Sequence, residues 1–271
     1  MSAAYRNFFG FSREPFSSDL EIENIIQTPE IKATYDRFEY TVKLGAIALV
    51  TGEIGAGKST ALRWIVAQLH PSCYRPIWIT ASSGSILEVY RQILAEFEVK
   101  TATSSRATLT GMIRKQISEL AQNRKLQPVL IIDEASLLRL EVFAELHTIS
   151  QFAGDSKPWL PIILIGQNNL ADNLLHRTAT PLASRIVARS HLESVNREKM
   201  DAYLIHHLSI AGLKNSPFEE AATTAIFQGS GGIFRKANHL ARGALIAAAS
   251  ERSQTVNVEH VRSAASEVFL N

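Results

Sequence analysis

Cysteine is almost missing from this sequence: Cys73 is the only one in 271 residues. A single cysteine excludes a disulfide framework and a cysteine zinc site within one chain, which fits a reducing cytosol. Long apolar runs are also missing, because the longest, such as 44–50, fall far short of the ~20 residues that a membrane helix needs. The N-terminus has no signal-peptide core. These absences predict a cytoplasmic protein with no membrane partner and a structural thiol at Cys73.

Neither sign of charge dominates. The 28 basic and 26 acidic residues leave a net charge of +2, which neither requires nor excludes nucleic acid, because binding depends on a local basic face. A hydrophobic content of 46% is enough for a large core. The length suits one or two domains.

A glycine-rich loop is the most informative motif. Residues 52–59 read Gly-Glu-Ile-Gly-Ala-Gly-Lys-Ser, the full Gly-x4-Gly-Lys-Ser pattern of a P-loop. An apolar stretch at 46–50 precedes it, and a helical pattern at 60–66 follows, which argues against the alternative of a chance glycine turn. Glycines let successive N–H groups surround an anion, and the helix N-terminus favours negative charge. We therefore expect a phosphate site.

The residues expected to contact the nucleotide form one continuous segment: Gly52, Glu53, Ile54, Gly55, Ala56, Gly57, Lys58, Ser59 and Thr60. Lys58 is expected to reach the β- and γ-phosphates, where it acts in catalysis, and the Ser59 hydroxyl to ligate Mg²⁺. ATP and Mg²⁺ are the cofactors that this pattern predicts.

An apolar strand at 129–132 runs directly into Asp133 and Glu134. In this Walker-B arrangement Asp133 is expected to hold Mg²⁺, mostly through water, and Glu134 to polarise the attacking water. Two carboxylates beside a triphosphate need the metal, since the repulsion between the negative charges would otherwise raise the pKa of one of the carboxyl groups. The alternative is a strand end with solubilising acids. The catalytic interpretation is favoured because the sequence also contains a P-loop, at a separation from Asp133 that we expect to fit two intervening strands.

Polar residues follow the next strand, at 161–166. Gln167 and Asn168 are both candidates to orient the water, and the alternative is that Asn168 or Asn169 caps a helix. One of these residues can serve each role.

Four arginines are further candidates: Arg177, Arg185, Arg189 and Arg235. An arginine near the sheet edge can neutralise charge at a neighbouring subunit's γ-phosphate, and Arg185, which opens the last strand, is favoured. A solvated surface role is the alternative for each. Arg235 stands in the first turn of a helix, where the helix dipole disfavours a cation, so a nucleotide contact is expected there.

The remaining pattern predicts the fold. Apolar strands alternate with helices as far as residue 193, which indicates a doubly wound parallel α/β domain over residues 1–193. Its aromatic N-terminal segment, at 5–16, is expected to be a loop anchored by buried rings. Only helices are expected from 194 to 271, which predicts a small all-helical domain. The expected strands are 46–50, 77–80, 129–132, 161–166 and 186–188, and the expected helices are 29–44, 60–66, 84–97, 108–123, 140–152, 194–211, 217–227, 233–250 and 256–269.

Taken together, these motifs resemble the AAA+ ATPases, from about Tyr5 to Phe269, and within them the ExeA-like group, also called general secretion pathway protein A. The segments that carry the resemblance are 8–11 with 15–16, 51–59, 131–135, 164–167 and 231–235. It implies a P-loop NTPase fold with a helical lid, a sensor-1 role for Gln167, a sensor-2 role for Arg235 and an arginine-finger role for Arg185. Asn168 departs from the group, in which a proline often follows the Gly-Gln pair.

Secretion-type members continue into a membrane helix and a peptidoglycan-binding domain, whereas this sequence ends at Asn271. We therefore expect a helper ATPase of DNA transposition, similar to the TnsC, IstB and MuB proteins. Such a protein assembles with ATP on duplex DNA, as a ring or filament, and recruits or activates a transposase. A secretion-type ATPase of the envelope, or a fragment of one, is the alternative, and a STAND-type switch is a third, weaker one.

A few contacts to DNA phosphates per subunit are sufficient for DNA binding, because the contacts of all subunits add along a ring or filament. Basic residues between the second and third strands are candidates for DNA contact, with a solvated helix face as the alternative: Arg106, Arg114, Lys115, Arg124 and Lys125.

Overall fold

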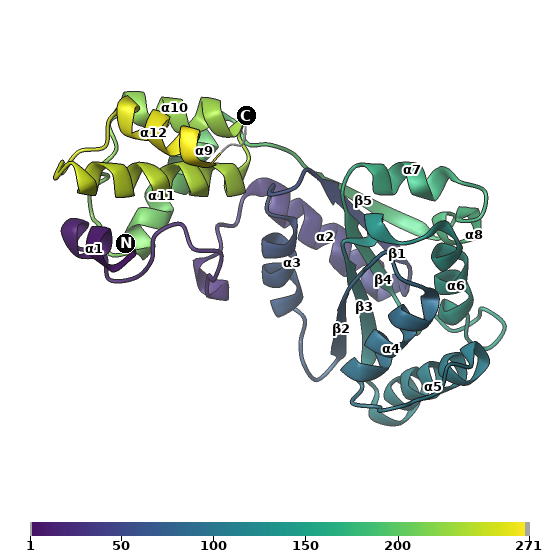
Figure 1. Cartoon of the computed structure of the whole chain (residues 1–271). Coiled ribbons are helices and arrows are strands. Elements are labelled where there is room, and N and C mark those ends of the chain that lie inside the picture. Colours follow the sequence, from purple (N-terminus) through teal and green to yellow (C-terminus); the bar gives the residue numbers. More distant parts are fainter. Residues whose placement is uncertain (1, 269–271) are drawn as a thin grey trace. The chain divides into compact units, whose positions relative to one another are not determined.

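The computed structural model describes residues 2–268 and divides into two compact units (Figure 1). The sheet unit comprises Gln27–Gly52 and Lys58–Leu192. The helical unit comprises Met1–Ile26, Glu53–Gly57 and Glu193–Asn271. The glycine-rich segment 53–57 thus belongs to the helical unit, although the strand before it and the helix after it belong to the sheet unit.

Five parallel strands form the sheet, in the order β2-β3-β4-β1-β5. They are β1 Ile47–Gly52, β2 Tyr74–Thr80, β3 Gln127–Asp133, β4 Ile162–Gly166 and β5 Ile186–Leu192. All five expected strands are present, and the parallel order confirms the doubly wound prediction. The expectation of two strands between the P-loop strand and the acidic strand is wrong: only β2 intervenes in sequence, and only β4 in space.

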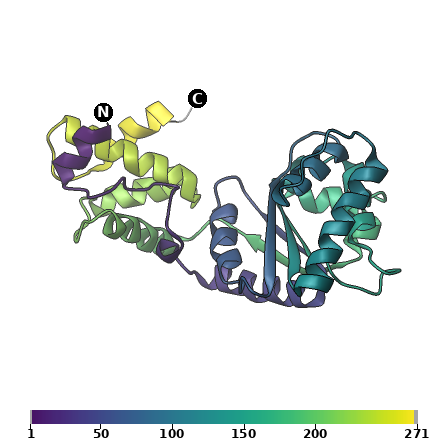
Figure 2. The same ribbon diagram turned by 90° about the horizontal axis from the view of Figure 1, so that it is seen from below.

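Helices cover both faces of this sheet, as both views show (Figures 1 and 2). On one face lie α2 Pro29–Leu44 and α3 Lys58–Ala67, and on the other lie α4 Ile86–Glu96, α5 Arg106–Ser118 and α6 Leu140–Ser150. Alternate strand residues point to opposite faces. Leu49 therefore packs in one core cluster with Tyr90, Ile113 and Phe143 from α4, α5 and α6.

Several short elements were not expected. They are the 3-10 helices Ile22–Asn24 and Ala135–Leu137 and the helices α7 Asn169–Leu175 and α8 Thr180–Ala183. The helix expected at 108–123 is α5 followed by a π-helical turn at Glu119–Arg124. Helices of one or two turns show too little of the 3.6-residue period to be read from apolar spacing.

The helical unit contains the four helices expected after residue 193. They are α9 Arg197–Ile210, α10 Glu220–Ser230, α11 Phe234–Ser250 and α12 Val258–Val268. The expected end of the last helix, Phe269, lies outside the described residues. Small and apolar side chains of α11 form the centre of the core: Ala237, Leu240, Ala241, Ala244, Leu245 and Ala248.

The N-terminal segment departs from the expected division. Residues 1–26 cluster with the helical unit, and residues Ser2–Phe9 form helix α1 where a loop was expected. The physical reason is that Tyr5, Phe11 and Phe16 are buried in the helical core cluster. Arg242 also donates from Nη2 to the Phe16 carbonyl over 2.6 Å. The rings are anchors, as expected, but they anchor a helix to the second unit.

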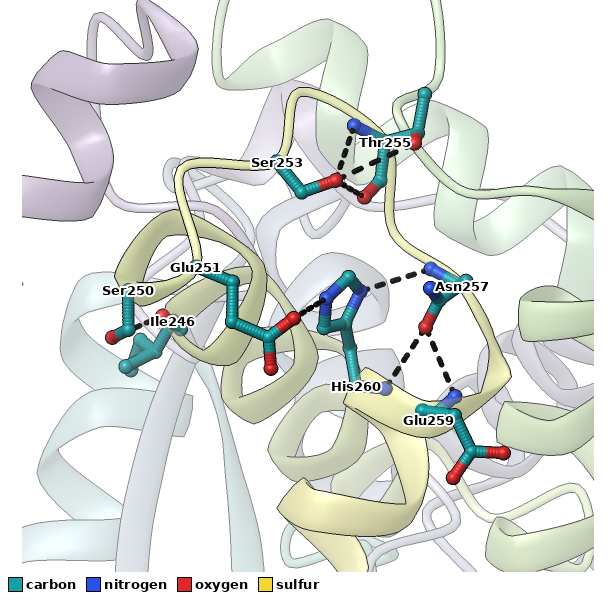
Figure 3. A network of polar contacts seen from close by, with 8 residues as sticks. All are labelled: Ile246, Ser250, Glu251, Ser253, Thr255, Asn257, Glu259 and His260. Carbon is teal, nitrogen blue, oxygen red and sulfur yellow. Dashed lines mark hydrogen bonds and ion pairs between the residues drawn. The ribbon is translucent and has the colours of Figure 1, made fainter.

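A polar turn joins α11 to α12 (Figure 3). The Asn257 side chain accepts hydrogen bonds from the backbone N–H groups of Glu259, over 3.0 Å, and His260, over 3.2 Å, so it caps α12. His260 Nδ1 accepts from the Asn257 N–H over 3.0 Å, and Nε2 lies 3.1 Å from Glu251 Oε2. Because Nδ1 is an acceptor, the imidazole proton is on Nε2, facing Glu251.

Candidate nucleotide-binding site

The P-loop lysine lies at the first position of α3. Lys58 is buried, with 7% of its surface exposed, and donates from Nζ to the Gly52 carbonyl over 2.9 Å. Gly57, just before it, has φ +89°, a conformation that side chains rarely adopt. Strand β1, the loop and α3 therefore supply the strand–loop–helix context of a phosphate site.

Ser59 and Asp133 meet at the end of the acidic strand. The Ser59 hydroxyl donates to Asp133 Oδ2 over 2.8 Å. Asp133 Oδ1 accepts from the Glu134 N–H over 2.8 Å, and the Asp133 carbonyl accepts from the Ala81 N–H over 2.8 Å. The serine and carboxylate oxygens are hard donors of the kind that Mg²⁺ prefers, so the residues present fit that ion.

Glu134 has an unusual backbone. Its φ of +52° and ψ of +32° place a non-glycine residue in the left-handed region, which costs free energy and marks functional sites. Its N–H is bound to Asp133, and its carbonyl accepts from the Leu137 N–H over 2.9 Å. This turn takes the chain from β3 into the 3-10 helix.

The candidate amides follow β4, which lies between β3 and β1. Because parallel strands end at the same edge, Gln167 follows a strand whose neighbours end in Asp133 and Gly52. The Gln167 N–H donates to Ser136 Oγ over 3.3 Å. Asn168 occupies the N-cap position of α7, and Asn169 is the first helical residue, but the Asn168 side chain makes no cap hydrogen bond. Capping therefore does not account for Asn168.

Arg185 lies at the amino-terminal end of the parallel strands, opposite to the end at which Gly52 and Asp133 lie. It immediately precedes β5, whose first residue pairs with Ile47 at the start of β1, whereas Gly52 ends that strand. Ile47 and Gly52 are five residues apart on β1, which corresponds to about 16 Å along the strand. Arg185 forms an ion pair with Asp155. Arg177 and Arg189 are exposed, and neither has a polar partner in the part of the chain that the structure describes.

Arg235 starts helix α11 in the helical unit, to which residues 53–57 also belong. Its N–H donates to the Gly55 carbonyl over 3.2 Å, and its side chain is exposed. A Cβ on Gly55 would lie 2.7 Å from Arg235 Cβ, and one on Gly57 would lie 3.3 Å from the Phe234 ring. The glycines thus permit close packing of the loop segment on the start of α11.

Sequence reasoning missed an aromatic chain that continues from this contact. The Phe234 and Tyr203 rings lie 4.4 Å apart, Tyr203 and His207 lie 4.3 Å apart, and His207 stacks on Phe16 at 5.6 Å. Burial raises the pKa of Tyr203 well above its usual range, and burial, with a smaller effect of His206, lowers the pKa of His207 to about 4. Tyr203 and His207 lie four positions apart on α9, but Phe16 and Phe234 are distant from them in sequence, so local spacing does not reveal the whole chain of rings.

A second missed contact concerns the strand before the P-loop. The Thr51 hydroxyl lies 2.9 Å from His191 Nδ1, on the adjacent strand β5. Only the strand register, which pairs Thr51 with His191, reveals it.

The basic residues considered for DNA contact are largely engaged within the protein. Arg106 pairs with Glu145 over 2.6 Å, Arg124 pairs with Glu119 over 3.3 Å, and Arg114 lies 4.9 Å above the Phe152 ring. The other two, Lys115 and Lys125, are exposed. For the three arginines this favours a structural role.

The parallel sheet with β4 between the P-loop strand and the acidic strand, and the Ser59–Asp133 contact, define a P-loop NTPase of the AAA+ type. Residues 42–174 match the family described as AAA domain. Over 267 residues the chain is 30% identical to General secretion pathway protein A from Aeromonas hydrophila. The match covers 97% of this chain and 48% of that protein. The chain thus spans about half the length of this relative. It belongs to the ExeA-like AAA+ proteins, and the resemblance is confirmed.

Solved structures share the fold. Cdc6p from Pyrobaculum aerophilum matches 94% of this chain and 71% of its own, with a TM-score of 0.75 and 17% identity. The Aeropyrum pernix ORC1 protein in complex with DNA matches 93% and 68%, with a TM-score of 0.71 and 17% identity. At such identities the likeness concerns the fold alone. Among the residues described here, no helix is both long and apolar enough to cross a membrane.

Proposed function

We propose that the chain binds ATP with Mg²⁺ and hydrolyses it. The observation that carries this proposal is the Ser59–Asp133 hydrogen bond at the end of β3, beside a P-loop whose lysine is buried. Lys58 would place its charge on the β- and γ-phosphates. Ser59 and Asp133 would hold Mg²⁺, which supplies neutralisation of phosphate charge when bound.

In this proposal Glu134 accepts a proton from the attacking water, and Gln167 orients that water. The left-handed backbone at Glu134 and the place of β4 in the sheet support these roles. The remaining P-loop residues, 52–57 and Thr60, would contribute backbone N–H groups, and Asn168 and Arg235 would contact the nucleotide. The packing of α11 on Gly55 supports a link between bound nucleotide and the helical unit.

Arg185 would act on the nucleotide of a neighbouring subunit. Arg185 lies at the end of the strands opposite to Gly52, and an arginine side chain is too short to span the length of β1. This supports action on a neighbouring subunit rather than on the P-loop of its own subunit. The protein would therefore assemble with ATP as a ring or filament of identical subunits.

The assembly would form on duplex DNA and regulate transposition by recruiting or activating a transposase in the cytoplasm. Two proteins with this fold, the Aeropyrum pernix ORC1 protein and Drosophila ORC, have been solved in complex with DNA, which supports DNA association. Backbone contacts would give affinity without sequence preference. Four members of the basic set are exposed, and of these Lys115 and Lys125 form no ion pair among the described residues, whereas Arg106 and Arg124 do.

The second candidate is a secretion-type ATPase of the cell envelope, which the 30% identity to General secretion pathway protein A favours. Electron microscopy with long duplex DNA at low salt separates the two. The first proposal expects rings or filaments with ATP and Mg²⁺, their release with ADP, and none when every subunit carries Lys58→Ala. Absence of DNA binding with ATP would favour the secretion-type function. A transposase that is retained only on the ATP-bound assembly would establish the partner.

A further inference from the structure

Asp155, the ion-pair partner of Arg185, lies in a turn with an unusual backbone conformation. Asp155 lies in a tight turn after α6, closed by an antiparallel bridge between Phe152 and Lys157. Three successive residues, Ala153, Gly154 and Asp155, have left-handed φ values of 48°, 62° and 69°. Two of them are not glycine, so this backbone costs free energy that the surrounding contacts must offset.

The turn is well anchored. The Phe152 side chain is 2% exposed and packs against the Trp159 ring at 5.4 Å. Within the turn, Ser156 donates to the Ala153 carbonyl from its N–H, over 3.3 Å, and from its hydroxyl, over 2.8 Å. The chain therefore holds Asp155 in one place, where its carboxylate meets the Arg185 guanidinium.

A third side chain lies near enough to this pair to feel both of its charges. His147, on α6, has a buried Nδ1 with no hydrogen-bond partner among the described residues. Burial lowers the pKa of His147, the nearby Arg185 charge lowers it further, and Asp155 acts in the opposite direction. Asp155 is the carboxylate that pairs with Arg185 in this cluster.

The pair is in conflict with the role proposed for Arg185. A guanidinium that neutralises a neighbouring subunit's γ-phosphate must direct its N–H groups to phosphate oxygens. In this structure the arginine side chain is only 24% exposed and is bound to a carboxylate instead. Two anions, Asp155 and the phosphate, would compete for one cation.

We propose that Asp155 is a positioning residue that retains Arg185 on its own subunit and thereby limits its action on the neighbouring active site. This inference rests on the proposed arginine-finger function. The carboxylate side chain is 49% exposed, and exposed ion pairs are weak. Removing its charge is therefore expected to raise the rate at the neighbouring site by about two- to fivefold, the range that such pairs allow.

Mixed assemblies isolate this effect. Acceptor subunits carry Arg185→Ala, so they have a P-loop but lack the finger. Donor subunits carry Lys58→Ala, so they lack their own active site but keep Arg185. Hydrolysis then occurs only where a donor finger meets an acceptor site. A donor with Lys58→Ala alone is compared with one that also carries Asp155→Asn, a residue that tolerates the left-handed conformation and so preserves the turn.

The expected result is a kcat about two- to fivefold higher with the Asp155→Asn donor, an unchanged KM for ATP, and return to the original rate with Asp155→Glu. A donor with Glu119→Gln, which removes the exposed Arg124–Glu119 pair, serves as the matched control and should have no effect. Equal or lower activity with Asp155→Asn overturns the retention role alone. No activity with either donor, when co-assembly is verified, overturns the finger assignment and the retention role together.

Discussion

Ser59 donates its hydroxyl hydrogen bond to Asp133 Oδ2 over 2.8 Å, although 74 positions separate them in the chain. The first residue follows the P-loop lysine, and the second ends the acidic strand β3. The contact brings two oxygen donors together at the place where the proposed Mg²⁺ would be held.

Asp133→Asn is expected to weaken the effect of Mg²⁺ on ATP binding. Asparagine keeps one oxygen that can accept from the Glu134 N–H, and its amide N–H can donate to the Ser59 hydroxyl oxygen, so the fold is expected to be kept while the charge is lost. The Kd for ATP in the presence of Mg²⁺ should rise at least about tenfold, which corresponds to about 1.4 kcal/mol. Calorimetric titration with and without Mg²⁺ measures this, and an unchanged Mg²⁺ dependence would show that Asp133 does not serve the ion.

Glu134→Gln is expected to keep ATP bound and to slow hydrolysis at least about tenfold, since the general base is lost. The prolonged ATP state should also stabilise the assembly. Single-turnover hydrolysis and ATP titration on the same sample separate the two effects. A variant that fails to bind ATP would instead assign Glu134 to the metal or to the fold.

Arg235→Ala is expected to weaken ATP binding or hydrolysis without changing the melting temperature, because the Arg235 side chain is exposed. Its backbone N–H, which donates to Gly55, is retained in alanine. Lys236→Ala, at the adjacent exposed position, is the matched control. Equal ATPase rates for the two variants would remove Arg235 from the site.

The buried His207 should make stability depend on pH. Its folded pKa of about 4 lies below the unfolded value of about 6.5, so protons bind preferentially to the unfolded state. The stabilising contribution is complete above the unfolded pKa and is lost as pH falls. Between pH 7.5 and pH 5 the free energy of unfolding should decrease by about 2 kcal/mol from this group.

His207→Phe tests this assignment, since phenylalanine can keep the ring contacts with Phe16 and Tyr203. Urea unfolding at several pH values should show a smaller decrease toward pH 5 than the unmodified protein shows. His239→Gln, at an exposed position, should leave the pH dependence as it is. An equal slope in the His207 variant would assign the dependence to other groups.

Local signals made much of the sheet unit predictable. Helix α2 begins and ends where expected, since Thr28 caps it, Pro29 opens it and Gly45 follows its last residue. Unbroken apolar runs identified the buried strands. Short elements such as α7 and α8 gave no comparable signal, because they span less than a full amphipathic pattern.

Contacts between distant segments could not be predicted. The aromatic residues of the N-terminus indicated burial, but nothing in their spacing identified the helical unit as the partner of Phe16. The ion pair of Arg185 with Asp155 likewise depends on a turn whose left-handed residues include alanine and aspartate. The sequence does indicate the chemistry of the motifs, because it depends on residue types at fixed spacing.

The most direct test of the proposed function is the rate of ATP hydrolysis measured at low salt with and without long duplex DNA. We expect hydrolysis that requires Mg²⁺ and Lys58, increases when DNA is added, and loses this increase steeply as salt rises, because neutralised phosphates release counterions. Hydrolysis that persists at the same rate in Lys58→Ala would contradict the assigned site. Lys58-dependent hydrolysis that DNA leaves unchanged at every salt concentration would contradict the assembly on DNA.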